Sequence, residues 1–145
     1  RFLTNAAFVF GKHGILSAEY EYVGYRGMKM DDNYHSFSGT NQNIYDLYVA
    51  SHNFKIGTEY QVGILRLRGG FIYAGSPYAS NTANSDAYKL IYSGGVGIAA
   101  NNFYFDLAYQ YTSAHEKYFM YNGQGSMAET STNGNRVIST IGFRF

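Results

Sequence analysis

The 145-residue sequence contains no cysteine, a single proline and only 14% charged residues. Without thiols the chain cannot build a disulfide framework, a thiolate metal site or a cysteine nucleophile. Its 11 basic and 10 acidic residues nearly cancel, so it lacks the basic stripe that binds nucleic acid, and we expect no nucleic-acid partner. No apolar run approaches the roughly 18 residues from which a transmembrane helix is inferred.

Aromatic residues and glycine are abundant instead. The chain has 16 Tyr, 11 Phe and 17 Gly, and 46% of its residues are hydrophobic, which argues against disorder and is typical of β-strands. Apolar and polar residues alternate with a period of two, most clearly where Phe103 and Leu107 fall on one face and Asp106 on the other. The alternation predicts an all-β fold whose strands span residues 2–10, 15–25, 53–62, 64–74, 88–98, 102–112 and 136–145.

The length and number of these strands suggest an outer-membrane barrel. Each is about ten residues long and would cross roughly 25 Å at a tilt near 40°, which matches the apolar band of such a barrel. Strands of soluble sandwiches are usually about five or six residues long. Seven strands is an odd number, whereas single-chain bacterial barrels have an even number. We therefore predict that residues 1–145 are the C-terminal portion of one larger antiparallel, up-and-down transmembrane β-barrel domain.

Short and long connections alternate along the chain, as expected when tight turns occupy the periplasmic rim and loops the outer rim. Within the first long connection, the spacing of Ile44, Leu47 and Tyr48 predicts a short helix. The short turns are expected at residues 11–14, 62–63 and 99–101, and the long loops at residues 26–52, 75–87 and 113–134.

The direction of the apolar face separates two interpretations. In a soluble lipocalin-like barrel the apolar side chains point inward, whereas in an outer-membrane barrel they face lipid. Thr58 and Ser139 interrupt the apolar faces, but these faces carry essentially no charge, and aromatic residues crowd the strand ends as in interfacial girdles. The pattern favours contact with membrane lipid, in the outer membrane of a Gram-negative bacterium.

The opposite face would then line a lumen. We expect carboxylates on the second and third strands to face guanidinium groups on the fourth, because the guanidinium fork suits carboxylate pairing. An ion-pair lattice is the favoured interpretation, since unpaired buried charge is costly. An arginine that meets a ligand carboxylate is the alternative. The predicted lumen-facing residues are Glu19, Glu21, Lys55, Glu59, Arg66, Arg68, Asp106, Arg136 and Arg144.

No motif points to an enzyme, a metal site or a cofactor. The four histidines are scattered over turns and loops without zinc-ligand spacing. The acidic pair Asp31 and Asp32 lacks the loop pattern of a calcium site. Glu19 and Glu21 share one strand face, but we expect them to pair with arginine rather than to act as an acid and a base.

Several segments together resemble one protein family. Residues 8–23 (FVFGKHGILSAEYEYV) resemble a strand–turn–strand of FadL/TodX-type outer-membrane transporters. Residues 53–60 (NFKIGTEY), 67–78 (LRGGFIYAGSPY), 102–109 (NFYFDLAY) and 142–145 (GFRF) resemble later strands of the same family. The sequence departs from the family pattern at two positions where aspartate is common, Glu19 and Gly24.

This resemblance implies a barrel of about fourteen strands and passive uptake of small hydrophobic ligands, such as long-chain fatty acids or aromatic hydrocarbons. It also implies that Phe143 and Phe145 form the signal for the outer-membrane assembly machinery. A porin-like or structural barrel, a soluble lipocalin-like binding barrel and a surface adhesin remain alternatives. If ligands are captured by loop aromatics and a neighbouring methionine, the candidate residues are Tyr34, Phe37, Tyr45, Tyr48, Tyr118, Phe119 and Met120.

Overall fold

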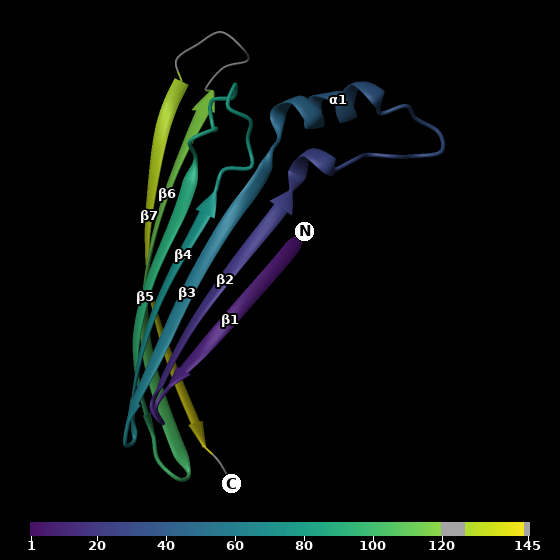
Figure 1. The fold of residues 1–145 in the computed structure, drawn as a ribbon. Coiled ribbons are helices and arrows are strands. Elements are labelled where there is room, and N and C mark those ends of the chain that lie inside the picture. The colour runs from purple at the N-terminus through teal and green to yellow at the C-terminus, as the bar shows by residue number, and fades with distance from the viewer. Residues whose placement is uncertain (120–126, 144–145) are drawn as a thin grey trace.

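The chain folds into one antiparallel sheet in which every strand pairs with the next along the sequence (Figure 1). The computed structural model describes residues 1–119 and 127–143. The all-β, up-and-down arrangement predicted from the alternation is confirmed. The strands are β1 (Phe2–Phe10), β2 (Gly14–Gly24), β3 (Ala50–Val62), β4 (Leu65–Gly75), β5 (Tyr88–Ala99), β6 (Phe103–Phe119) and β7 (Met127–Phe143).

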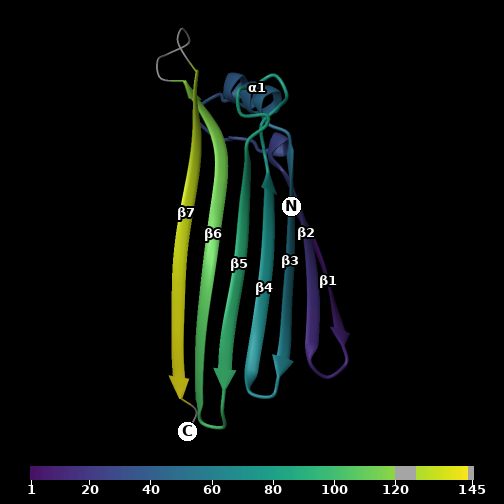
Figure 2. The same ribbon diagram turned by 90° about the vertical axis from the view of Figure 1, so that its left-hand side faces the viewer.

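Tight turns join the strands at one end of the sheet, and longer segments join them at the other (Figure 2). Gly11 and Gly63 occupy the turns after β1 and β3 with φ of 62° and 59°, a conformation that glycine adopts without steric cost. The long β2–β3 connection holds a 3₁₀ turn, η1 (Tyr25–Gly27), and a helix, α1 (Ser38–Leu47). The predicted short helix is thus confirmed; it ends at Leu47, and Tyr48 is its C-cap.

The predicted long loop at residues 113–134 is wrong. Most of this segment continues β6 and β7, which remain paired from Ser113↔Asn133 to Phe119↔Met127. A β-ladder forms through backbone hydrogen bonds and does not require apolar side chains. Here serine, threonine, asparagine and charged residues occupy both faces, so no hydrophobic alternation marks the strands.

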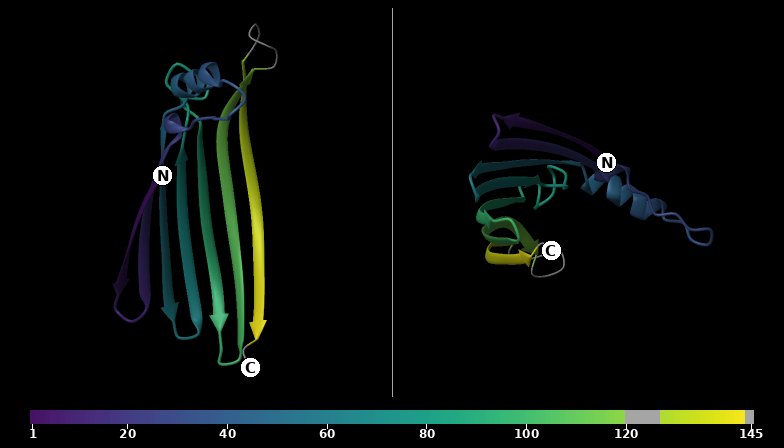
Figure 3. Two further views of the ribbon diagram at one scale, coloured as in Figure 1. Left: turned by 90° about the vertical axis from the view of Figure 1, so that its right-hand side faces the viewer. Right: turned by 90° about the horizontal axis from the view of Figure 1, so that it is seen from below.

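The sheet curves into an open trough (Figure 3). Its order runs from β1 to β7, and these two edge strands do not pair with each other. The described residues therefore form an open sheet, and the larger barrel predicted from the sequence remains a prediction. None of the described helices is long and apolar enough to cross a membrane.

Cross-strand register gives the sheet one apolar face and one charged face. On the apolar face, Ile56 pairs with Phe71, which pairs with Tyr92. On the charged face, Glu59 lies opposite Arg68. Because the ladder pairs residues of the same orientation, each of these two sets lies on one side of the sheet.

Exposure is inverted relative to a water-soluble domain. The described residues contain no buried hydrophobic side chain. Along β3, Phe54 and Ile56 are 47% and 48% exposed, whereas Lys55, Glu59 and Gln61 on the other face are only partly exposed. The described residues therefore form no apolar core, and along β3 the polar side chains are the better covered ones.

Candidate functional site

The carboxylates of β2 are bound by residues nearer than the fourth strand. Lys55 Nζ lies 2.7 Å from Glu19 Oε1, and Arg1 Nη2 lies 2.5 Å from Glu21 Oε1. Asn53 Nδ2 also donates to Glu21 Oε2 at 3.2 Å. The prediction that carboxylates face guanidinium groups on β4 is therefore wrong for β2, whereas Glu59 on β3 does pair with Arg68 on β4. Register places Glu19 directly opposite Lys55 on β3, and β4 is one strand further away.

Arg68 on β4 joins two carboxylates from different strands. Its Nε donates to Glu59 Oε2 on β3 at 2.6 Å, and its Nη1 donates to Asp106 Oδ1 on β6 at 2.5 Å. Asp106 reaches Arg68 over β5, where Gly97 lies opposite it in the ladder. A Cβ on Gly97 would collide with the Asp106 carboxylate. Arg68 is thus held in an ion-pair cluster that depends on a glycine.

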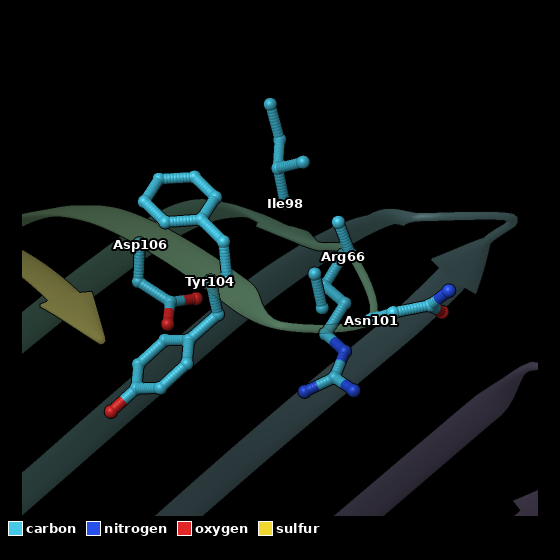
Figure 4. A pocket seen from close by; sticks show the side chains of 8 residues that line it. Arg66, Ile98, Asn101, Tyr104 and Asp106 are labelled. Carbon is cyan, nitrogen blue, oxygen red and sulfur yellow. The ribbon is translucent and has the colours of Figure 1, made fainter. Parts of the chain in front are cut away.

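Arg66 is placed on the same face as Arg68 but in a different environment. Its Nε is buried and has no hydrogen-bond partner among the described residues. It borders a cavity of about 310 Å³ at the tight-turn end of the sheet, between β4 and β6 (Figure 4). We call this cavity the Arg66 cavity; its lining residues are Arg66, Ile98, Ala99, Ala100, Asn101, Phe103, Tyr104 and Asp106.

The remaining two predicted lumen residues are Arg136 and Arg144. Arg136 is exposed on β7 and faces Gln110 in the ladder. Within residues 1–119 and 127–143, it forms no ion pair. Arg144 lies outside the described residues.

At the loop end of the sheet, Tyr48 and Tyr78 form an aromatic pair. Their ring centroids are 5.3 Å apart, and their backbones form an isolated antiparallel bridge. The hydrogen bond from Val49 N to Pro77 O, 2.8 Å long, fixes this approach. A cavity of about 200 Å³ lies beside the pair, lined by Leu47, Tyr48, Tyr78, Thr82, Ala83 and Asn84.

The β4–β5 connection that carries Tyr78 is anchored to β6. Asn84 Nδ2 donates to Lys117 O at 2.9 Å, and Lys117 N donates to Asn84 Oδ1 at 2.6 Å. Lys117 Nζ also lies 2.6 Å from Asp86 Oδ2. These contacts preorganise the segment that presents Tyr78.

The predicted loop aromatics do not form one surface. Tyr34, Phe37 and Tyr45 belong to the segment around α1, which projects away from the sheet (Figure 1). Tyr34 is 88% exposed, and the Arg26 guanidinium lies 3.8 Å from the centre of the Tyr45 ring.

Two of the predicted aromatics, Tyr48 and Tyr118, instead flank Tyr78. Tyr48 packs beside it, and Tyr118 lines a second cavity, of about 320 Å³, that Tyr78 also borders. Tyr78 is not among the loop aromatics predicted from the sequence. Tyr78 lies three residues beyond the end of β4, and its backbone bridges to Tyr48, two residues before β3 begins. The side chain of Phe119 and all of Met120 lie outside the description.

The predicted assembly signal falls partly within the described residues. Phe143 is 67% exposed at the end of β7 and lies 5.6 Å from Phe103, centroid to centroid, while Phe145 lies outside the described residues. Within the described chain, no three histidine, aspartate or glutamate side chains gather as a metal-binding group. Comparison with known proteins gave no matching family model, curated protein or solved structure.

Proposed function

We propose that this chain is the C-terminal part of an outer-membrane β-barrel that takes up hydrophobic compounds in a Gram-negative bacterium. The observation that supports it best is the inverted exposure of β3, where Phe54 and Ile56 are exposed and Lys55 is covered. In water, this apolar face would remain hydrated at about 25 cal/mol per Å². In a bilayer the same face is solvated by lipid, and the charged face lines the interior.

The open sheet fits this proposal if further strands of the same protein complete the wall. The unpaired edges of β1 and β7 carry backbone donors and acceptors, which must be paired within the hydrocarbon region. About seven more strands would give the fourteen that the sequence resemblance implies. The ion pairs of the charged face would then compensate charge within the barrel rather than select a ligand.

Ligand capture is assigned to the loop end. The Tyr48–Tyr78 pair and its cavity of about 200 Å³ offer apolar contact in a preorganised frame. A cavity of roughly 150 Å³ with an apolar lining is sufficient to bind benzene. A hydrophobic compound would leave water here, gaining about 0.8 kcal/mol per buried CH₂, before it moves passively along the wall or into the bilayer.

Membrane orientation can be tested with a pair of adjacent tryptophan substitutions, because the chain has no natural tryptophan. Phe71 and Ile72 are neighbours on β4 and therefore lie at the same depth. Phe71 belongs to the apolar face with Ile56, and Ile72 to the charged face with Lys55. In vesicles of brominated phospholipid, we expect strong quenching of Phe71→Trp fluorescence and weak quenching of Ile72→Trp.

Other outcomes identify the competing functions. Equal, weak quenching of both variants, with β-structure that forms in plain buffer, would replace the transporter with a soluble ligand-binding barrel. Strong quenching of Phe71→Trp alone, combined with ion conductance and no saturable toluene binding, would indicate a porin-like barrel. Sedimentation with and without detergent micelles supplies the control for aggregation through the open edges.

A further inference from the structure

Arg66 and Arg68 lie two residues apart on one face of β4, yet only Arg68 has its acceptors within the described chain. Arg68 donates to both Glu59 and Asp106. The buried Nε of Arg66 has no partner in the same part of the chain. A buried donor is normally satisfied by protein, water or ligand, so the Arg66 guanidinium is available for an acceptor that these residues do not supply.

The polar side chains nearest to Arg66 make their hydrogen bonds to other residues. Gln61, which lies opposite Arg66, donates its side-chain amide to Gly63 O at 3.1 Å. Asp106 borders the Arg66 cavity, but its Oδ1 is bound by Arg68 at 2.5 Å. Arg68 shares its single positive charge between Asp106 and Glu59, so it reduces the repulsion between Asp106 and an anion without cancelling it.

Other donors border the same cavity. Figure 4 shows the Arg66 guanidinium and the Tyr104 ring extending to the same side of the ribbon, with Asn101 beside Arg66. Across residues 1–119 and 127–143, neither the Tyr104 hydroxyl nor the Asn101 amide makes a side-chain hydrogen bond to another described residue. The cavity volume of about 310 Å³ leaves room for a small ion or for the head group of a longer molecule.

We propose that the Arg66 cavity binds a small oxyanion, a carboxylate or a phosphate, through the Arg66 guanidinium. The planar fork of arginine matches both groups with two parallel N–H···O bonds. The inference rests on the proposed function only for the source of the anion, which in a transporter would be the head group of an amphipathic ligand. The binding site itself can be tested with free ions.

The test uses the chain refolded in detergent micelles and labelled with ¹⁵N at its six arginines. The Arg66 Nε–H signal is assigned by its loss in Arg66→Gln. Acetate, octanoate, inorganic phosphate and octanol are titrated separately, and calorimetry supplies the affinities. We expect a saturable shift of the Arg66 signal with at least one oxyanion and none with octanol. Tighter binding of octanoate than of acetate identifies the oxyanion as the carboxylate head group of an alkyl-chain ligand. Binding of phosphate alone identifies it as a free ion.

Matched variants distinguish a specific binding site from a nonspecific effect of positive charge. Arg66→Gln should weaken oxyanion binding at least tenfold, and Arg66→Lys should recover only part of it because the fork is lost. Arg136→Gln makes the same charge change on the same face and should leave the affinity within twofold. Equal weakening by both glutamine variants, or no oxyanion binding by the wild-type chain, would overturn the inference.

Failure of the anion site and failure of the proposed function give different results. A chain whose Phe71→Trp variant is quenched by brominated lipid but whose Arg66 signal never shifts refutes the anion site alone. A chain that stays out of the bilayer yet binds an oxyanion through Arg66 refutes the transporter alone. Circular dichroism of each variant confirms that it retains the β-structure of the wild type.

Discussion

The Asp106 carboxylate and the Arg68 guanidinium meet at 2.5 Å although their strands, β6 and β4, are separated by β5. The contact passes over Gly97, whose lack of a Cβ leaves room for the carboxylate. A glycine in the middle of a strand usually weakens it. Here it permits an ion pair between strands that are not neighbours.

Substitution of Gly97 should therefore break this ion pair. We expect Gly97→Ala to displace Asp106 from Arg68 and to lower the free energy of unfolding by about 0.5–1 kcal/mol, the range of a partly exposed pair. Urea unfolding of the micelle-bound chain measures the loss. Gly94→Ala is the control, because a Cβ there would meet only the Arg68 carbonyl oxygen, at 4.0 Å. Equal destabilisation by both variants would assign the effect to backbone propensity.

Removal of the Arg68 guanidinium should destabilise the chain more than removal of the Arg66 guanidinium. Arg68→Gln leaves Glu59 and Asp106 without their cation, and we expect a loss of about 1–2 kcal/mol, reduced from the fully buried case because these side chains are partly exposed. A double-mutant cycle with Asp106→Asn should give a coupling of about 0.5–1 kcal/mol. A coupling near zero would show that the contact does not contribute to stability.

The anchor between Lys117 and Asp86 should survive over a wide pH range. The hydrogen bond from Lys117 lowers the pKa of Asp86 below its ordinary 3.8, and the bond to Asp86 raises the pKa of Lys117 above its ordinary 10.5. The carboxylate's contribution is complete above 3.8 and disappears as the pH falls through its lower folded pKa. The ammonium's contribution is complete below 10.5 and disappears as the pH rises through its higher folded pKa.

Hydrogen exchange can follow this anchor through the Lys117 amide, which donates to Asn84 Oδ1. On acidification, we expect its protection to begin to fall only below pH 3.8, after correction for the intrinsic exchange rate. Asp86→Asn is the reference variant and should show lower protection at neutral pH with no acid-dependent step. Loss of protection in the wild type near pH 6 would contradict the assignment.

Tyr78 should matter for hydrophobic ligands, whereas Tyr34 should not. Tyr78→Ala removes one wall of the loop-end cavity and should weaken binding of toluene about fivefold, equivalent to about 1 kcal/mol of lost aromatic contact. Saturation-transfer NMR on the micelle-bound chain gives the affinity. Tyr34→Ala removes a ring that is 88% exposed and serves as the matched control. Equal losses of toluene affinity in the two variants would implicate the α1 segment in binding. Unchanged affinity in both variants would show that neither aromatic group captures the ligand.

The sequence alone determined the strands, the two faces and the positions of the turns, because these depend on short-range patterns. A period of two assigned Ile56 and Phe71 to one face and Lys55 and Glu59 to the other, and the ladder places them so. The same pattern missed the outer halves of β6 and β7, where polar residues pair through the backbone and no alternation remains.

Tertiary structure alone decided which partners the charged and aromatic residues have. Arg66 and Arg68 are equivalent in the alternation, yet Arg68 pairs with Glu59 and Asp106, whereas Arg66 borders a cavity and its Nε has no partner among the described residues. Asp106 is 38 residues from Arg68 in the sequence, and it reaches Arg68 only because register sets Gly97 beside it. Such contacts depend on how distant strands align and how the sheet curves, and local spacing carries no information about either.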